Sequence, residues 1–313
     1  MPVTRVMLEY VHPWPNHAGL FLARRNGGFA RAGIDVDLLS DGYDRGGAPE
    51  VLARGEYDIA SLRLGHVLQS RSTGTPFVAV ATLNQRQLGS VITTPETGIA
   101  RFADLEGKTV AVPPVARLIH EVREAVAADG ADPALVHFAD PGNWEPDVRS
   151  VEQGLYDAVM NVRAWEPFQG NTPLDEVVVL EFDSVGVAPH HSYFLSVRQD
   201  TLDRNPDFVR SFLAAAANGY REAMEDEDGA VEAMSWPMCH VRPDVLRASL
   251  RAIRDSWFTP RDAGVRSRKT SSPLTRRGWT RAAGSKKVAA SKIWRVPGQT
   301  TSCPDALRKR LLA

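Results

Sequence analysis

Gly55-Glu56-Tyr57-Asp58-Ile59-Ala60 returns further along the chain as Gly154-Leu155-Tyr156-Asp157-Ala158-Val159. In each copy an amphipathic stretch ends at a glycine, a Tyr-Asp pair follows, and a short apolar run begins. Glycine suits the left-handed backbone that closes a helix, and the apolar run indicates a buried strand. The repeat therefore predicts two similar α/β lobes with a cleft for a small molecule between them.

Strand and helix signals alternate on both sides of each copy. Apolar runs predict strands at 3–10, 33–39, 57–61, 77–82, 109–112, 135–138, 158–162, 177–182 and 192–197. Helical spacing predicts helices between them, at 17–26, 46–54, 64–72, 116–129 and 147–153, and three more at 207–224, 231–236 and 244–256. Alternating strands and helices favour parallel-dominated sheets.

Length and composition are those of a globular protein. The chain has 313 residues, enough for two ordinary domains, with 43% hydrophobic and 24% charged residues. No apolar run reaches the roughly 18 to 20 residues that span a bilayer. The sequence as written shows no signal peptide, which predicts a cytoplasmic protein. A native start further upstream would instead predict a periplasmic or extracellular one.

Basic residues are concentrated at the C-terminal end. Residues 265–313 hold 13 of the 37 Lys+Arg residues and a single acidic residue, Asp305. This pattern is typical of an arm that binds nucleic acid or an acidic membrane, or of a disordered extension. We favour a third hypothesis, a shifted reading frame near Gly264, because residue usage changes there together with charge. We therefore assign this tail no function and expect no nucleic-acid partner.

Several segments resemble the substrate-binding proteins for sulfonates and thiamine pyrimidines: Trp14-Pro15-Asn16-His17, Gly28-Phe29, Gly33-Ile34-Asp35-Val36, Asp104–Pro113 and Asn205–Arg210. The resemblance implies an α/β, two-lobed type II periplasmic-binding-protein fold with a central cleft. It implies a discontinuous first lobe (1–83 and 190–264), a second lobe (84–189), and two crossings that form a hinge.

Ligands of open α/β sheets sit beyond the carboxyl ends of the strands. That rule predicts these ligand-binding residues: Trp14, Asn16, His17, Ser61, Arg63, Asn84, Val115, Asn161, Arg163, Trp165 and His191. Trp14 and Trp165 are candidates for stacking on a ring, although both could simply pack in a core. Arg63 and Arg163 follow the two repeated strands, and we expect them to face each other across the cleft and bind an anionic group.

The histidines give weaker signals. Consecutive strand residues face opposite sides, so at most one of His190 and His191 points inward. His12, His17 and His66 lack any recognised metal-ligand spacing, and the two cysteines have no CxxC spacing. We therefore expect no metal.

We expect a solute-binding protein for a small anionic or heteroaromatic ligand: a sulfonate, an aromatic carboxylate or a pyrimidine. An ABC-transporter permease would be its partner if the protein is exported.

The alternative is a cytoplasmic enzyme on the same fold, decarboxylase- or desulfinase-like, acting on an aromatic acid through His12, Arg63 and His190. The fungal pyrimidine synthases, which the chain also resembles, use a pyridoxal-phosphate lysine and a cysteine-rich iron motif. Residues 1–264 hold one lysine, Lys108, and one cysteine, Cys239. We therefore expect no cofactor. Desulfinases of this fold use a cysteine nucleophile where this chain has His12, so their thiolate mechanism cannot run here.

Overall fold

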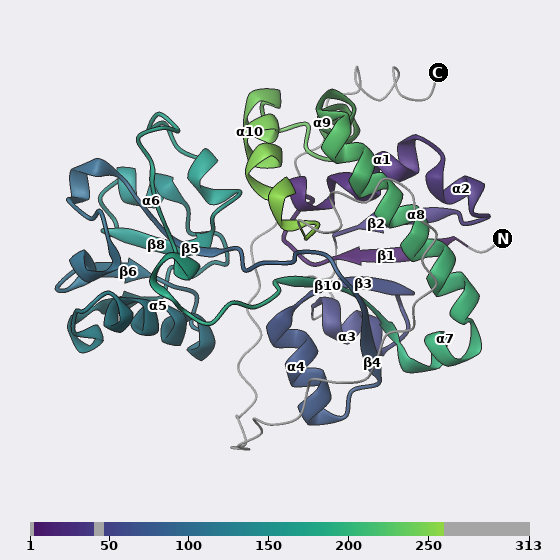
Figure 1. Ribbon diagram of the computed structural model, residues 1–313, viewed down its shortest axis with the longest axis horizontal. Coiled ribbons are helices and arrows are strands. Elements are labelled where there is room, and N and C mark those ends of the chain that lie inside the picture. Colours follow the sequence, from purple (N-terminus) through teal and green to yellow (C-terminus); the bar gives the residue numbers. More distant parts are fainter. Residues whose placement is uncertain (1–2, 41–46, 260–313) are drawn as a thin grey trace.

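The computed structural model describes residues 3–40 and 47–259, and the basic tail at 265–313 lies outside this range. Two bodies lie side by side along the long axis, each built around one sheet (Figure 1). No helix in the described part is both long and apolar enough to cross a bilayer.

Both sheets have five strands in the same topological order. The first runs β2 (Val36–Leu39), β1 (Thr4–Leu8), β3 (Ile59–Arg63), β10 (Tyr193–Arg198), β4 (Phe77–Thr82). The second runs β7 (His137–Ala139), β6 (Thr109–Ala111), β8 (Ala158–Val162), β5 (Gly89–Thr93), β9 (Val178–Glu181). In each sheet one strand, β10 or β5, runs against its neighbours. The prediction of α/β sheets with mainly parallel strands is confirmed, and each sheet is mixed because it contains one antiparallel strand.

The chain passes between the two sheets twice, from β4 to β5 and from β9 back to β10 (Figure 1). The sequence did not predict β5, because polar residues precede it and Gly89-Ser90 begin it. Pairing with β8 and β9 on both sides supplies the hydrogen bonds that make this segment a strand. The exact lobe limits, 1–83 with 190–264 and 84–189, stay a prediction.

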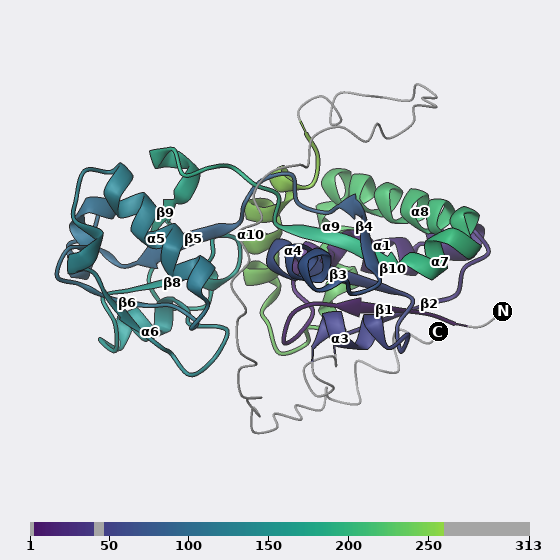
Figure 2. The ribbon, with the colours of Figure 1, turned by 90° about the horizontal axis from the view of Figure 1, so that it is seen from below.

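Helices cover both faces of each sheet. On the first sheet, α1 (Ala18–Arg25), α8 (Pro206–Glu225), α9 (Glu227–Ser235) and α10 (Pro243–Ile253) bury the larger core cluster. α3 (Ala48–Ala53) covers the opposite face, and α4 (Leu64–Thr73) lies on that side too (Figure 2). On the second sheet, α5 (Ala116–Ala128) and α6 (Val148–Glu152) take opposite faces. The shorter α2 (Gly28–Arg31) and α7 (Gln199–Arg204) connect elements.

The tightest helix contact joins α1 and α8. A Cβ atom at Gly219 would lie 2.1 Å from the backbone oxygen of Gly19, so only glycine permits this approach. α8 itself begins at Pro206, where the missing N–H is not needed, and the Asn205 side chain accepts from the Phe208 N–H.

The repeated phrase has the same structure in both copies. Gly55 (φ +74°) and Gly154 (φ +68°) both adopt the left-handed conformation after α3 and α6. Each helix closes with the paired hydrogen bonds of a Schellman motif. The next aspartate then accepts a backbone N–H from the neighbouring strand: Asp58 from Arg5, and Asp157 from Thr109, both at 2.8 Å. The prediction of helix-closing glycines before buried strands is confirmed.

Candidate functional site

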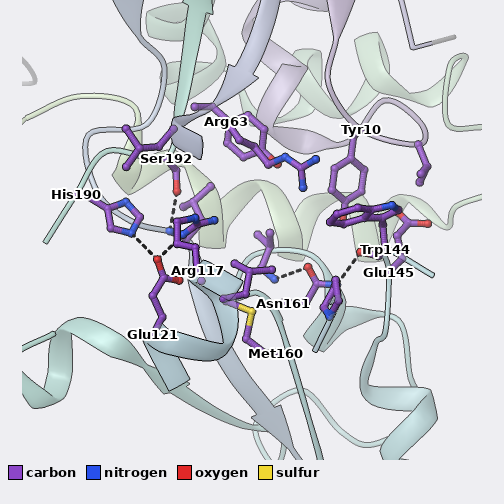
Figure 3. Close-up of a pocket in the computed structure, with 18 residues that line it drawn as sticks. Tyr10, Arg63, Arg117, Glu121, Trp144, Glu145, Met160, Asn161, His190 and Ser192 are labelled. Atoms are coloured by element: carbon purple, nitrogen blue, oxygen red, sulfur yellow. Dashed lines mark hydrogen bonds and ion pairs between the residues drawn. The ribbon is translucent and has the colours of Figure 1, made fainter. Parts of the chain in front are cut away.

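A cleft lies between the two sheets, at the edge where the carboxyl ends of β1, β3, β6 and β8 meet. The antiparallel strands β5 and β10 begin at this same edge. Figure 3 shows Tyr10 and Trp144 together on one side of the cleft, and His190, Arg117 and Glu121 together on the other. The cleft therefore has an aromatic side and a polar side. Its position, beyond the carboxyl ends of the parallel strands, is the one that the strand-end rule for α/β sheets predicts.

Arg63, the last residue of β3, lines the cleft as predicted from the sequence. Its Nε donates to Glu9 Oε1 at 2.5 Å, and its backbone N–H donates to Glu9 Oε2 at 2.6 Å. Burial would raise the pKa of Glu9, but the charges of Arg63 and His66, with their hydrogen bonds, lower it to about 2. The cation of Arg63 is thus matched by a buried carboxylate directly behind the cleft.

Trp144 reaches the cleft from the loop after β7 in the second sheet. The guanidinium carbon of Arg63 lies 5.1 Å from the centroid of the Trp144 ring, a cation–π distance that joins the two halves. Sequence reasoning missed Trp144, although the strand-end rule applied to β7 would have selected this loop.

Asn161, at the end of β8, also lines the cleft, as predicted. Its Nδ2 donates to the backbone oxygens of Trp144 and Pro146, at 3.3 and 3.1 Å. Its Oδ1 accepts from the Val162 N–H. The amide is therefore occupied in holding the loop that carries Trp144.

Glu121, on α5, faces the cleft with only 10% of its side chain exposed. Arg117 donates to its Oε1, and His190 Nε2 lies 3.3 Å from the same oxygen. The hydrogen bond to Glu121 raises the pKa of His190. Of the two consecutive histidines, His190 lines the cleft and His191 does not: His191 Nδ1 donates to the Gln85 backbone oxygen, in the first crossing.

His12 bridges the two halves beside the cleft. Its Nε2 lies 3.1 Å from Glu145 Oε1, and its Nδ1 donates to the Pro13 backbone oxygen. Burial lowers the pKa of His12, but the hydrogen bond and charge of Glu145 outweigh it, and the net shift is upward. His12 therefore binds Glu145 most strongly when protonated.

A second group of predicted residues lies buried outside the cleft lining. Trp14 packs in the core of the first sheet, with its ring centroid 6.0 Å from that of Tyr193. His17 accepts from the Trp14 N–H, and burial, with a contribution from His12, lowers its pKa to about 3. Ser61 is fully buried on β3.

The side chains of Asn16 and Asn84 bind each other and do not line the cleft. Their side-chain amides exchange two hydrogen bonds, at 3.0 and 2.8 Å, and Trp257 Nε1 also donates to Asn16 Oδ1. This network ties the first crossing to the body of the first sheet. Both residues are polar and follow predicted strands, which is why the sequence pattern selected them.

Arg163 and Trp165 follow β8 but turn away from the cleft lining. Arg163 pairs with Asp255 at 3.1 Å and Glu181 at 3.7 Å, so it does not face Arg63 across the cleft. Trp165 packs into the core cluster of the first sheet. Val115, which precedes α5, does not line the cleft either.

The described residues do not fit a pyridoxal-phosphate enzyme. Lys108, the only lysine in 3–40 and 47–259, lies just before β6, and its Nζ donates to the Thr97 backbone oxygen at 2.9 Å. It does not line the cleft. In the same ranges, no group of three or more His, Cys, Asp or Glu side chains is arranged to hold a metal ion.

Several solved structures share this fold. The alkanesulfonate-binding protein SsuA from Xanthomonas axonopodis pv. citri superposes with a TM-score of 0.60 at 15% identity, covering 79% of this chain and 83% of that one. The aliphatic sulphonate-binding protein SsuA from Escherichia coli gives 0.61 at 16% identity, covering 80% and 79%. The two-lobed periplasmic-binding-protein fold is thereby confirmed.

Sequence relatives have pyrimidine-related names. The formylaminopyrimidine-binding protein of Halalkalibacterium halodurans is 27% identical over 238 residues, 75% of this chain and 70% of that protein. The 4-amino-5-hydroxymethyl-2-methylpyrimidine phosphate synthase of Uromyces fabae is 24% identical, covering 81% and 75%. The profile of the family described as NMT1/THI5 like matches residues 14–230. Since that match spans most of the chain, the protein belongs to the NMT1/THI5-like family.

Proposed function

We propose that this protein is a solute-binding protein that takes an uncharged, nitrogen-containing aromatic ring, of the aminopyrimidine class, into the cleft. The observation that carries the proposal is the charge balance around Trp144. Arg63 is paired with Glu9, Arg117 with Glu121, and Glu145 with His12. The cleft thus combines an aromatic surface with charges that are already matched.

This balance disfavours a sulfonate or carboxylate. An anion entering the cleft loses its hydration and gains little, because the carboxylate of Glu9 already neutralises Arg63 at 2.5 Å. Glu121 and Glu145 would repel the anion directly. A neutral ring loses much less hydration and keeps the favourable contacts with the cleft walls.

A flat ring suits the aromatic side of the cleft. Stacking on an aromatic side chain contributes about 0.5 to 1.5 kcal/mol beyond area burial, and Trp144 and Tyr10 supply such surfaces. Polar groups on the ring would reach the opposite, polar side. The name of the relative from H. halodurans, a formylaminopyrimidine-binding protein, supports the same ligand class.

The residues that line the cleft favour binding rather than catalysis. Neither a lysine nor a cysteine lines the cleft, in the part of the chain that the structure describes. Closure of the two halves around the ligand, and delivery to a membrane permease if the protein is exported, are part of this proposal.

The test is a thermal-shift and calorimetry series with 4-amino-2-methylpyrimidine, an alkanesulfonate and benzoate, followed by recovery of the ligand. We expect the aminopyrimidine to raise the melting temperature, since a ligand at 100 times its Kd adds about 2.7 kcal/mol of stability. It should be recovered unchanged. Stabilisation by the sulfonate or benzoate alone, or consumption of the pyrimidine, would overturn the proposal.

Trp144→Ala is the variant that tests the location. It should lower aminopyrimidine affinity by tenfold or more, by removing the stacking surface and its buried area. Trp236→Ala is the matched control, because Trp236 ends α9 with 45% of its surface exposed and does not line the cleft. Equal losses in the two variants would contradict the proposed site.

A further inference from the structure

Arg63 lines the cleft, and its side chain is held from behind. Its Nε donates to Glu9 Oε1 at 2.5 Å, and its backbone N–H donates to Glu9 Oε2 at 2.6 Å. His66 Nδ1 lies 2.8 Å from the same Oε1, and only 2% of the Glu9 side chain is exposed. Two contacts with one buried carboxylate therefore fix both the backbone and the side chain of Arg63.

Trp144 is held differently, because its backbone is fixed and its ring is not. Asn161 Nδ2 donates to the backbone oxygens of Trp144 and Pro146, which gives the loop a defined position. In residues 3–40 and 47–259 the indole nitrogen has no hydrogen-bond partner, and the side chain is partly exposed. Several staggered rotamers are open to such a side chain. A contact made by the ring itself must select among them.

The guanidinium of Arg63 makes that contact. Its carbon lies over the Trp144 ring, 5.1 Å from the centroid, and the Arg63 side chain points toward Trp144 (Figure 3). A cation attracts the electron-rich face of an aromatic ring, and the attraction is stronger where water is partly excluded. Arg63 ends β3 in the first sheet, whereas Trp144 lies in a loop of the second. The contact therefore orients a ring of one half from a fixed point on the other half.

We propose that Arg63 is a positioning residue for Trp144: it holds the indole in the orientation in which the ring stacks on the ligand. This inference rests on the proposed function, in which Trp144 supplies the stacking surface. Arg63 then acts on affinity through Trp144 and not through a contact of its own with the ligand.

A double-mutant cycle separates this role from direct contact with the ligand. Affinity for 4-amino-2-methylpyrimidine is measured by calorimetry in the wild type, Arg63→Gln, Trp144→Ala and the double variant. The glutamine side chain keeps a donor for Glu9 and removes the positive charge. Arg63→Gln should lower the affinity about three- to fivefold, the size of a partly exposed cation–π contact. In the Trp144→Ala background it should change the affinity by less than about twofold, because the ring that Arg63 orients is absent.

Crystal structures of the wild type and Arg63→Gln, both without ligand, follow the ring directly. We expect a single orientation of the indole in the wild type. In Arg63→Gln the indole should occupy more than one rotamer, while the loop backbone stays where Asn161 holds it.

Arg123→Gln is the matched control. The guanidinium carbon of Arg123 lies 5.2 Å from the centroid of the Phe138 ring, Arg123 is exposed, and neither residue lines the cleft. This variant should keep the wild-type affinity. Arg63→Lys serves if Arg63→Gln does not fold by circular dichroism. It keeps a positive charge beside Glu9 but lacks the planar group that stacks on a ring, so the same loss is expected.

The possible failures are distinguishable. If Arg63→Gln lowers affinity equally with and without the Trp144 ring, Arg63 contacts the ligand itself. If it lowers affinity in neither background, or if the indole keeps its single orientation, Arg63 does not position the ring. Each of these results overturns the positioning role and leaves the proposed function standing. If the wild type does not bind the aminopyrimidine, the proposed function fails, and the role of Arg63 in binding fails with it.

Discussion

The two copies of the Gly-x-Tyr-Asp phrase have the same backbone role and different side-chain outcomes. In both, the glycine closes a helix and the aspartate anchors the neighbouring strand at 2.8 Å. Each following strand ends near an arginine. Arg63 lines the cleft, whereas Arg163 binds Glu181 and Asp255 away from it.

The difference comes from the carboxylates that other segments bring to each strand end. Glu9, directly after β1, holds Arg63 at the mouth of the cleft. On the other side, Glu181 ends β9 and Asp255 follows α10, and both pair with Arg163, whose side chain does not line the cleft. A duplicated backbone motif therefore does not duplicate a binding residue, because long-range neighbours decide where an arginine points.

The largest effect is expected from removing the carboxylate that holds Arg63. Glu9→Gln should lower the free energy of unfolding by about 3 kcal/mol at pH 7, since the pKa of Glu9 falls from 4.5 to about 2 in the folded protein. A depressed pKa stabilises the fold above pH 4.5, and this stability is lost as the pH falls toward 2. Urea denaturation of both proteins across this range measures the effect.

Asp255→Asn is the control at the other arginine. Because 51% of the Asp255 side chain is exposed, its pairing with Arg163 should contribute less than about 1 kcal/mol. A loss at Asp255 as large as that at Glu9 would show that the two arginines are held with equal strength.

Substitutions of the two glycines in the repeated phrase, Gly55 and Gly154, should have stability effects of intermediate size. Alanine at Gly154 should cost about 1 to 2 kcal/mol, from the left-handed conformation alone, because a Cβ there meets nothing within 4 Å. Alanine at Gly55 should cost more, since its Cβ would lie 2.0 Å from a guanidinium nitrogen of Arg198 and would displace that side chain. Thermal unfolding of the two variants measures the difference. Equal losses would mean that Arg198 moves aside without cost.

The smallest expected effect concerns the contact between His12 and Glu145, which joins the two halves. The pKa of His12 is raised above 6.5, so its contribution is complete below pH 6.5 and is lost as the pH rises through the folded-state pKa. Partial exposure limits the contribution to under about 1 kcal/mol. The stability difference between wild type and His12→Gln should therefore shrink from pH 6 to pH 8. A difference that is constant across this range would contradict the assignment.

Sequence patterns predicted the elements that follow from local chemistry. The helix-closing glycines, the proline start of α8 and most strands were predicted within a few residues, because capping and apolar runs act over short distances. β5 was missed, since its stability comes from pairing with β8 and β9 rather than from its own residues.

The candidate site was predictable in part. The strand-end rule selected Arg63 and Asn161, both of which line the cleft. It also selected Trp14, Asn16 and His17, which are buried behind it. The rule was not applied to the loop after β7, which carries Trp144. It gives no signal for Glu121, because that residue lies on a helix and not at a strand end.

The sequence by itself determined the duplicated α/β architecture and the edge of the sheets at which the cleft lies. Backbone preferences of glycine, proline and apolar runs are local, so they can be recognised from short stretches of the sequence. Only the tertiary structure decided which charges meet: that Glu9 holds Arg63 at the cleft, and that Asp255 and Glu181 hold Arg163 away from it. Electrostatic pairing depends on distances between segments far apart in the chain, and those distances exist only after folding.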